Sequence, residues 1–109
     1  LVYCAIAPIP GIVLLDTKHR VLKTAVLSVG TLDASLVHPR EVFREAAGGG
    51  AAANVLFHNH PSGDPTPSAE DLTLTARLVE AGRVMGIDVV DHLVLADARY
   101  CSFKEMGRL

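Results

Sequence analysis

The order of hydrophobic and polar residues along this chain predicts alternating strands and helices. Two apolar runs rich in valine and leucine flank a polar turn at residues 16–20, which favours a β-hairpin. In two later places the apolar residues recur at the three- and four-residue spacing of a helix. We therefore expect strands on both sides of that turn and over 51–60, 87–97 and 99–103, with helices over 37–47 and 68–86.

Proline and glycine mark the ends of these elements. Pro39 suits the first turn of the shorter helix, and the glycines at 48–50 end that helix. Pro61 must end the third strand, because proline donates no hydrogen bond to a sheet ladder. In the longer helix we expect a buried stripe drawn from Leu72, Leu74, Ala76, Leu78, Val79, Ala81 and Arg83.

The order of the expected elements indicates the fold class. Two strands, a helix, a strand, a helix and two strands follow one another without a repeat or a break in composition. Such an alternation is typical of the α/β class, with helices packed on a sheet. We expect a single domain over residues 1–109, built as a three-layer sheet sandwiched by helices.

Composition narrows the class of protein. The chain has 109 residues, of which 50% are hydrophobic and 20% charged, enough for one packed core. A net charge of −2 gives no electrostatic footprint for nucleic acid. Cys4 and Cys101 lie far apart, so we expect reduced thiols rather than a disulfide framework or a thiolate zinc site. With no apolar run long enough for a membrane span and no signal-peptide pattern, we expect a cytoplasmic protein.

The stretch "FHNHPSGDPTPSAED", residues 57–71, concentrates the candidate chemistry. Residues two apart on a strand point to the same face, so His58 and His60 could share one metal ion. The stiff loop that follows returns the chain to a helix whose first turn holds Asp71, which could supply a third ligand. Three protein ligands and one open position for water form the arrangement of a catalytic zinc site.

A simpler interpretation of the same residues needs no metal. Ser68 and Asp71 stand at the spacing of a capping box, in which the serine caps the helix and the acid reaches back to it. Two histidines one residue apart are suggestive without being decisive. The residues alone leave both interpretations open.

Several other polar residues are candidates for supporting roles. His92 lies among apolar neighbours on an expected central strand, so we expect a core histidine or a support for a ligand rather than a ligand. Asp91 beside it could orient a ligand imidazole. We expect His19 and His38 to be surface residues or caps, and Asp64 to fix a turn with Pro65.

Taken together, the pattern H-x-H-P-x6-S-x2-D resembles the JAMM (MPN-plus) metalloprotease signature. The flanking stretches "LDTKHRVL", "VGTLDASLVHPREVFREA", "DHLVL" and "RYCSFKE" look like the bacterial RadC family, over roughly residues 12–105. The resemblance implies an MPN-type (cytidine-deaminase-like) mixed β-sheet sandwiched by helices. It also implies a metallopeptidase-type hydrolase with zinc bound by His58, His60 and Asp71, and Ser68 stabilising the oxyanion. Family members usually carry a helix-hairpin-helix region upstream, which we do not expect within residues 1–109.

One residue departs from the family pattern. In RadC-like sequences, the glutamate that takes the proton from zinc-bound water sits five residues before the glycine of "GTLDAS". Counting back from Gly30 gives Ala25, which cannot accept a proton. Glu41 and Glu45 are the nearest alternatives upstream of the histidines, although Glu41 belongs to a stretch that the family carries beside its own glutamate. A general base contributes about 10²–10⁴-fold to a rate, so we expect impaired catalysis.

Three functions therefore compete. The first is a zinc-dependent hydrolase of peptide or isopeptide bonds, and the second is a non-catalytic MPN-type interaction module. The third is a role in DNA repair or processing, suggested only by the family's historical label, and the acidic pI of about 6.2 argues against direct nucleic-acid binding. Ala25 favours the second over the first, whereas an intact set of three ligands favours either over a plain scaffold.

Overall fold

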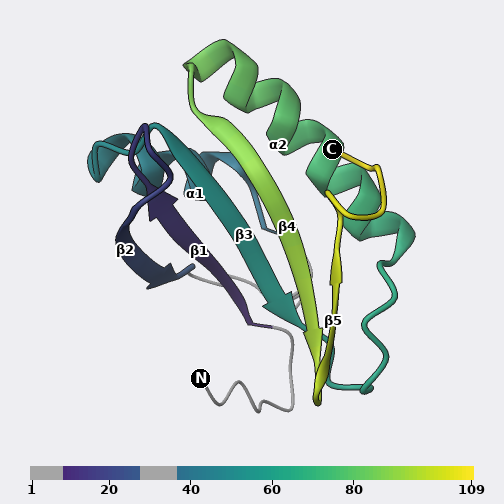
Figure 1. Cartoon of the computed structure of the whole chain (residues 1–109). Coiled ribbons are helices and arrows are strands. Elements are labelled where there is room, and N and C mark those ends of the chain that lie inside the picture. The colour runs from purple at the N-terminus through teal and green to yellow at the C-terminus, as the bar shows by residue number, and fades with distance from the viewer. Residues whose placement is uncertain (1–8, 28–36) are drawn as a thin grey trace.

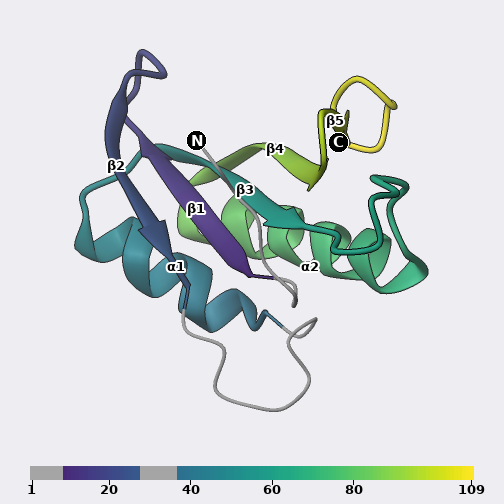
Figure 2. The ribbon, with the colours of Figure 1, turned by 90° about the horizontal axis from the view of Figure 1, so that it is seen from below.

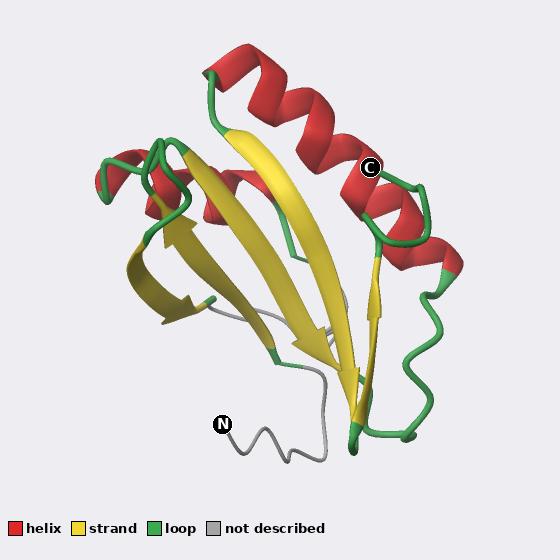
Figure 3. Cartoon of the chain, in the orientation of Figure 1, coloured by secondary structure: helices red, strands yellow, loops and turns green. Residues whose placement is uncertain are grey.

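The computed structural model describes residues 9–27 and 37–109. Five strands form one sheet in the order β2-β1-β3-β4-β5, and two helices complete the fold (Figures 1 and 3). The strands are β1 (Pro10–Leu15), β2 (Val21–Val26), β3 (Ala53–Asn59), β4 (Asp88–Ala96) and β5 (Arg99–Ser102), and the helices are α1 (Pro39–Gly48) and α2 (Ala69–Met85). The expected single α/β domain is confirmed, with every expected element present.

The sheet is mixed. Strand β1 runs antiparallel to both β2 and β3, β3 runs parallel to β4, and β4 runs antiparallel to β5. The tight turn between β1 and β2 includes His19 at a φ of 60°, a left-handed conformation that closes the hairpin. A parallel pair needs a long crossover, and α2 supplies it between β3 and β4.

Both helices lie against the same face of the sheet (Figure 2). They share one cluster of buried side chains with the strands, which includes Ile12 of β1, Val42 of α1, Leu56 of β3 and Leu78 of α2. The mixed sheet with two helices agrees with the expected fold class, while the described residues form two layers rather than three. The reason is the crossover: α1 and α2 each leave and rejoin the sheet on one side, so they pack on each other and on that side alone.

The helix ends follow the sequence signals closely. His38 caps α1 by accepting a hydrogen bond from the backbone N–H of Arg40, and Ser68 caps α2. Gly86 ends α2 in a left-handed conformation at a φ of 73°, which glycine adopts without steric cost. Strand β3 ends at Asn59, so His58 lies within the strand, whereas His60, which was expected on it, follows it.

The buried stripe of α2 differs from the expected one. Its buried residues are Asp71, Thr75, Leu78 and Gly82, so the half near the helix start is polar and the other half is apolar. Leu78 was expected there, but Val79 is 41% exposed. The spacing of hydrophobic residues predicts the wrong buried face for α2, because it ignores polar residues. Asp71 and Thr75 face inward to make hydrogen bonds.

The two cysteines and the helices add two further observations. Cys101 is a free, half-buried thiol, and Cys4 lies outside the described residues. Within the described ranges, neither helix has the length and apolar character needed to cross a bilayer.

Candidate metal centre

Three side chains meet where β3 ends and α2 begins. His58 is the penultimate residue of β3, His60 follows the strand, and Asp71 lies in the first turn of α2. The backbone N–H of His60 still donates to the carbonyl of Leu95 in β4, at 2.8 Å, so the residue stays attached to the sheet edge. The carboxyl end of parallel strands is a common place for binding sites in open α/β sheets.

The ligand atoms of the three residues converge. The Nε2 atoms of His58 and His60 are 3.0 Å apart, and each lies 3.2 Å from one carboxylate oxygen of Asp71. All three ligand atoms lie within 4.8 Å of one another, and this is the one such group of histidine, cysteine and acidic residues found in the described part of the chain. These three residues could hold a metal ion.

Asp71 serves the helix and the cluster at once. One of its oxygens accepts the backbone N–H of Ser68 at 2.9 Å, while the Ser68 hydroxyl oxygen accepts the backbone N–H of Asp71 at 3.1 Å. The capping box is therefore present, and the same carboxylate also faces both histidines. The two interpretations of the sequence pattern do not exclude each other.

Asp71 is held in its ionised form. Burial opposes this by raising the pKa of Asp71, but in the absence of metal a hydrogen bond donated by the His58 ring and another from the backbone N–H of Ser68 outweigh it and hold that pKa well below its usual range. Asp71 is 6% exposed and His58 is 9% exposed, so the charge lies in a largely dry environment. A buried anion beside two imidazoles is a strong attractor for a cation.

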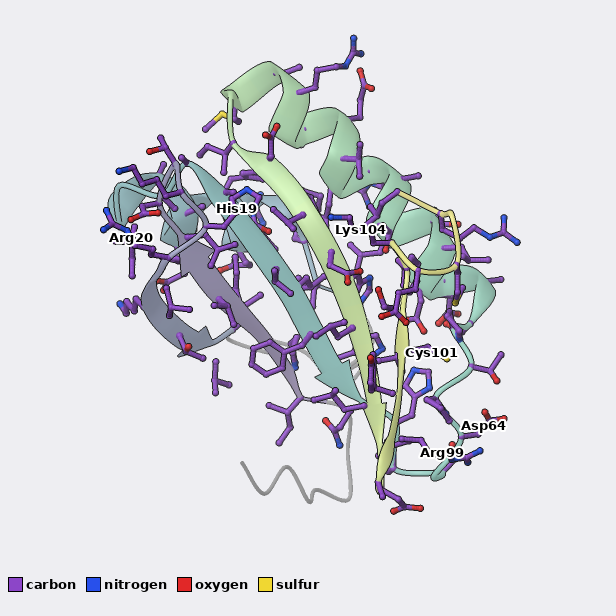
Figure 4. The ribbon with its side chains drawn as sticks, viewed as in Figure 1. His19, Arg20, Asp64, Arg99, Cys101 and Lys104 are labelled. Atoms are coloured by element: carbon purple, nitrogen blue, oxygen red, sulfur yellow. The ribbon has the colours of Figure 1, made fainter. Side chains whose placement is uncertain are left out.

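The loop after His60 fixes the ring of that histidine. Its Nδ1 lies 3.0 Å from the backbone carbonyl of Asp64, an acceptor only, so Nδ1 must carry the hydrogen. The neutral ring then leaves Nε2 with a bare lone pair that faces the cluster. The loop itself is tied to the start of β5, where the Arg99 guanidinium donates to the carbonyl of Gly63 at 2.6 Å (Figure 4).

His58 is fixed from the opposite side. Its Nδ1 lies 2.9 Å from Nε2 of His92, which is fully buried in β4 and stacked on Phe103 with ring centroids 4.5 Å apart. Burial, together with the nearby His58, lowers the pKa of His92 to about 3. His92 is thus a buried neutral histidine that contacts a candidate ligand, in line with its expected place in the sequence.

The other polar candidates lie elsewhere. Asp91 contacts no candidate ligand among the described residues; its carboxylate accepts the Ser102 hydroxyl and the backbone N–H groups of His92 and Lys104, so it organises the turn after β5. The carboxylate of Asp64 accepts from Thr66, as a turn residue should, but the role of its backbone carbonyl was not foreseen. Every residue has a backbone carbonyl, so the sequence could not reveal that the carbonyl of Asp64 contacts His60.

Ala25 and the two candidate glutamates are separate from the cluster. Glu41 pairs with Arg44, and Glu45 pairs with Lys23. Ala25 pairs with Ile12 across the sheet and packs against the hydrophobic core. Neither glutamate belongs to the group of ligand atoms in the described part of the chain.

Comparison with known proteins identifies the family. The model of the RadC-like JAB domain matches residues 10–108. The chain belongs to the RadC-like JAB domain family. The resemblance of the sequence pattern to RadC is thereby confirmed, and the mixed sheet with two helices is consistent with a JAB/MPN-like α/β fold.

Curated relatives agree with this assignment. A UPF0758 protein of Symbiobacterium thermophilum is 57% identical over 98 residues, covering 90% of this chain and 42% of the relative. UPF0758 proteins of Desulforamulus reducens and Methanosarcina mazei are 54% and 53% identical, covering 86% and 85% of this chain and 41% of each relative. The chain thus spans less than half the length of the relatives it matches.

Proposed function

We propose that this domain binds one Zn²⁺ through His58, His60 and Asp71. The observation that carries the proposal is the convergence of two imidazole Nε2 atoms and one carboxylate, with neighbouring atoms 3.0 to 3.2 Å apart. At such distances these atoms need a proton or a metal cation between them, because bare nitrogen lone pairs and a carboxylate repel one another. The remaining nitrogen of each ring has a protein partner, as is usual for metal-binding histidines.

The donor set fits zinc better than a harder cation. Two imidazoles and one carboxylate suit Zn²⁺, whereas Mg²⁺ and Ca²⁺ prefer oxygen ligands alone. A set of three protein ligands leaves a position for water, and zinc would lower the pKa of that water to about 7. The chain's own residues hold the ligand geometry: the β3 end, the loop after His60 and the start of α2 are each fixed by hydrogen bonds.

The chemistry that we propose for this site is hydrolysis of a peptide or isopeptide bond, as in a metallopeptidase. Ser68 is exposed at the start of α2. Its hydroxyl oxygen accepts the backbone N–H of Asp71, which leaves its own hydrogen free of the capping contact. A hydroxyl so anchored could donate to the oxyanion of a substrate, the role that we propose for Ser68.

We propose that Ala25 impairs this hydrolysis. Ala25 pairs with Ile12, which pairs with Leu56, and residues opposite one another point to the same face. His58 lies two residues beyond Leu56 on that same face, so the Cα atoms of positions 25 and 58 are about 12 Å apart by ordinary strand spacing. A glutamate at position 25 would therefore point toward the face that carries the candidate ligands, whereas alanine offers no base.

The alternative is a non-catalytic MPN-type interaction module, associated with DNA repair or processing and located in the cytoplasm. The observation that favours it is the same Ala25, a core methyl group where a base is expected. In that case zinc holds the end of β3 to the start of α2 and does no chemistry. Because the net charge is −2, we expect any such module to reach DNA through a partner.

Metal content of the purified domain tests the proposal. We expect about one zinc per chain, lost in His58→Ala. His19→Asn is the matched control, because it also removes an imidazole, at an exposed turn where asparagine accepts the left-handed backbone. Absence of zinc from the unaltered chain, or its retention in His58→Ala, would contradict the proposed site.

A further inference from the structure

The contacts of His58 continue beyond His92 into α2. The Nδ1 atom of His92 lies 2.5 Å from the hydroxyl oxygen of Thr75, and that hydroxyl donates to the backbone carbonyl of Asp71 at 2.9 Å. Thr75 and His92 are 2% and 0% exposed, so water does not compete for these bonds. A line of buried hydrogen bonds thus begins at one candidate ligand, His58, and ends at the backbone of another, Asp71.

The direction of each hydrogen bond follows from what each group can donate. The backbone carbonyl of Asp71 is an acceptor only, so the single hydroxyl hydrogen of Thr75 must point to it. Thr75 then has only lone pairs left for His92, and Nδ1 of His92 must carry the hydrogen between them. In a neutral ring this leaves Nε2 of His92 as an acceptor.

The same reasoning reaches the candidate metal ligand. Because Nε2 of His92 accepts, Nδ1 of His58 must carry the hydrogen of that contact. The neutral His58 ring then has its lone pair on Nε2, the atom that faces His60 and Asp71. The opposite direction of bonds would place a hydrogen on that Nε2 and block it as a ligand.

We propose that Thr75 and His92 are positioning residues that set the tautomer of His58, so that its Nε2 lone pair is available to a metal ion. This inference builds on the proposed zinc site and adds two residues to it. It also explains why the buried stripe of α2 is polar where it begins. Partners of this kind typically change metal affinity about 10–100-fold when removed.

Two substitutions at Thr75 distinguish the effect of its hydroxyl group from the effect of its packing. Thr75→Val keeps the shape of the side chain and removes the hydroxyl, whereas Thr75→Ser keeps the hydroxyl and removes a methyl group. Without the hydroxyl, Nδ1–H of His92 has no acceptor, so His92 moves its hydrogen to Nε2 and donates to His58. We expect Thr75→Val to weaken Zn²⁺ binding about 10–100-fold in a competition with a chelator, and Thr75→Ser to bind like the unaltered chain.

The tautomer of His92 can also be observed without metal. Nitrogen-15 NMR of the metal-free chain should show His92 protonated at Nδ1 and bare at Nε2, with the opposite state in Thr75→Val. The proposal is overturned if the unaltered chain shows hydrogen at Nε2 of His92, or if Thr75→Val and Thr75→Ser change zinc affinity equally. Because the NMR measurement needs no zinc, failure of the zinc site and failure of this hydrogen-bond direction give different results.

Discussion

The two halves of the interface between α2 and the sheet are built in different ways. In the polar half, Asp71 and Thr75 face His58 and His92 through hydrogen bonds. In the apolar half, Leu78 is fully buried in the hydrophobic cluster. Gly82, one turn further, lies so close to the segment before β4 that a Cβ atom there would be 2.4 Å from the carbonyl oxygen of Ile87.

This difference teaches where stability and function reside in the domain. Apolar contacts lower the free energy of the folded chain without regard to direction, whereas buried polar groups cost free energy unless each one finds a partner. In the polar half each buried polar side chain has a partner. Within the described ranges, the one buried side-chain atom without a hydrogen-bond partner is Oδ1 of Asn54, which does not belong to this half. The polar half therefore depends on a specific arrangement, and we expect it to respond to metal and pH, while the apolar half responds to neither.

The largest expected effect comes from placing a base at position 25, on the sheet face that carries the candidate ligands. In the zinc-loaded chain, Ala25→Glu should raise hydrolysis of peptide or isopeptide substrates by about 10²–10⁴-fold, since a general base contributes that much. Ala25→Gln has the same size without basicity and should give no gain. A zinc-bound, folded Ala25→Glu variant with unchanged activity would disprove the explanation based on the missing base.

Next in size is the loss of a core side chain. Leu78→Ala should lower the free energy of unfolding by about 2–5 kcal/mol, because the lost apolar contacts and the cavity both count. Urea denaturation measures this, and Val84→Ala, at a residue 80% exposed on the same helix, should stay within about 0.5 kcal/mol. Zinc stoichiometry should remain about one in both; its loss in Leu78→Ala would show that the two halves are not independent.

Removal of metal should lower the free energy of unfolding through the polar half alone. At a free zinc concentration 100 times the dissociation constant, binding should raise the free energy of unfolding by about 2.7 kcal/mol, and a chelator should abolish that gain. Unfolding curves with zinc and with chelator measure the difference. In His58→Ala the two curves should coincide, and a persistent gap there would mean that zinc acts elsewhere on the chain.

The last predicted effect, which builds up gradually, is the response of the metal-free chain to pH. The pKa of His92 is lowered from 6.5 to about 3, so its contribution to stability is complete above pH 6.5 and is lost as the pH falls toward 3. The loss can reach about 1.4 kcal/mol per pH unit. The pKa of Asp71 is also lowered, from 3.8, so that group weakens the fold only below pH 3.8.

Urea denaturation at several pH values between 7 and 4, with chelator present, checks this response. His92→Phe keeps a ring against Phe103 and removes the titration, so its stability should vary less with pH over that range. Leu78→Ala should be less stable throughout but show the same dependence as the unaltered chain. Equal slopes for His92→Phe and the unaltered chain would assign the pH response to other groups.

Much of this arrangement could be predicted from sequence, for local reasons. Ser68 and Gly86 give the start and end of α2 because capping depends on nearest neighbours along the chain. The grouping of His58 with Asp71 was also predictable, since both lie within one short stretch that folds back on itself.

What the sequence could not give depends on distant contacts. His92 meets His58 across 34 positions of the chain, and only the register of β3 with β4 decides that they touch. Thr75 looks like an ordinary helix residue until its inward direction is known. The packing of α1 and α2 on one face likewise follows from the path of the whole chain, which no local pattern contains.

The hydrogen bond from the Arg99 guanidinium to the carbonyl of Gly63 has a consequence for the domain during its synthesis. Gly63 has a φ of 83°, and a side chain there would meet Asp97, 2.8 Å from its carboxylate, so the loop is shaped to lie against the β4–β5 turn. The three candidate ligands all leave the ribosome before β4 and β5 do. A nascent chain that ends after α2 therefore displays every ligand without the strands that hold them in place, so binding of the proposed zinc should await the synthesis of β4 and β5.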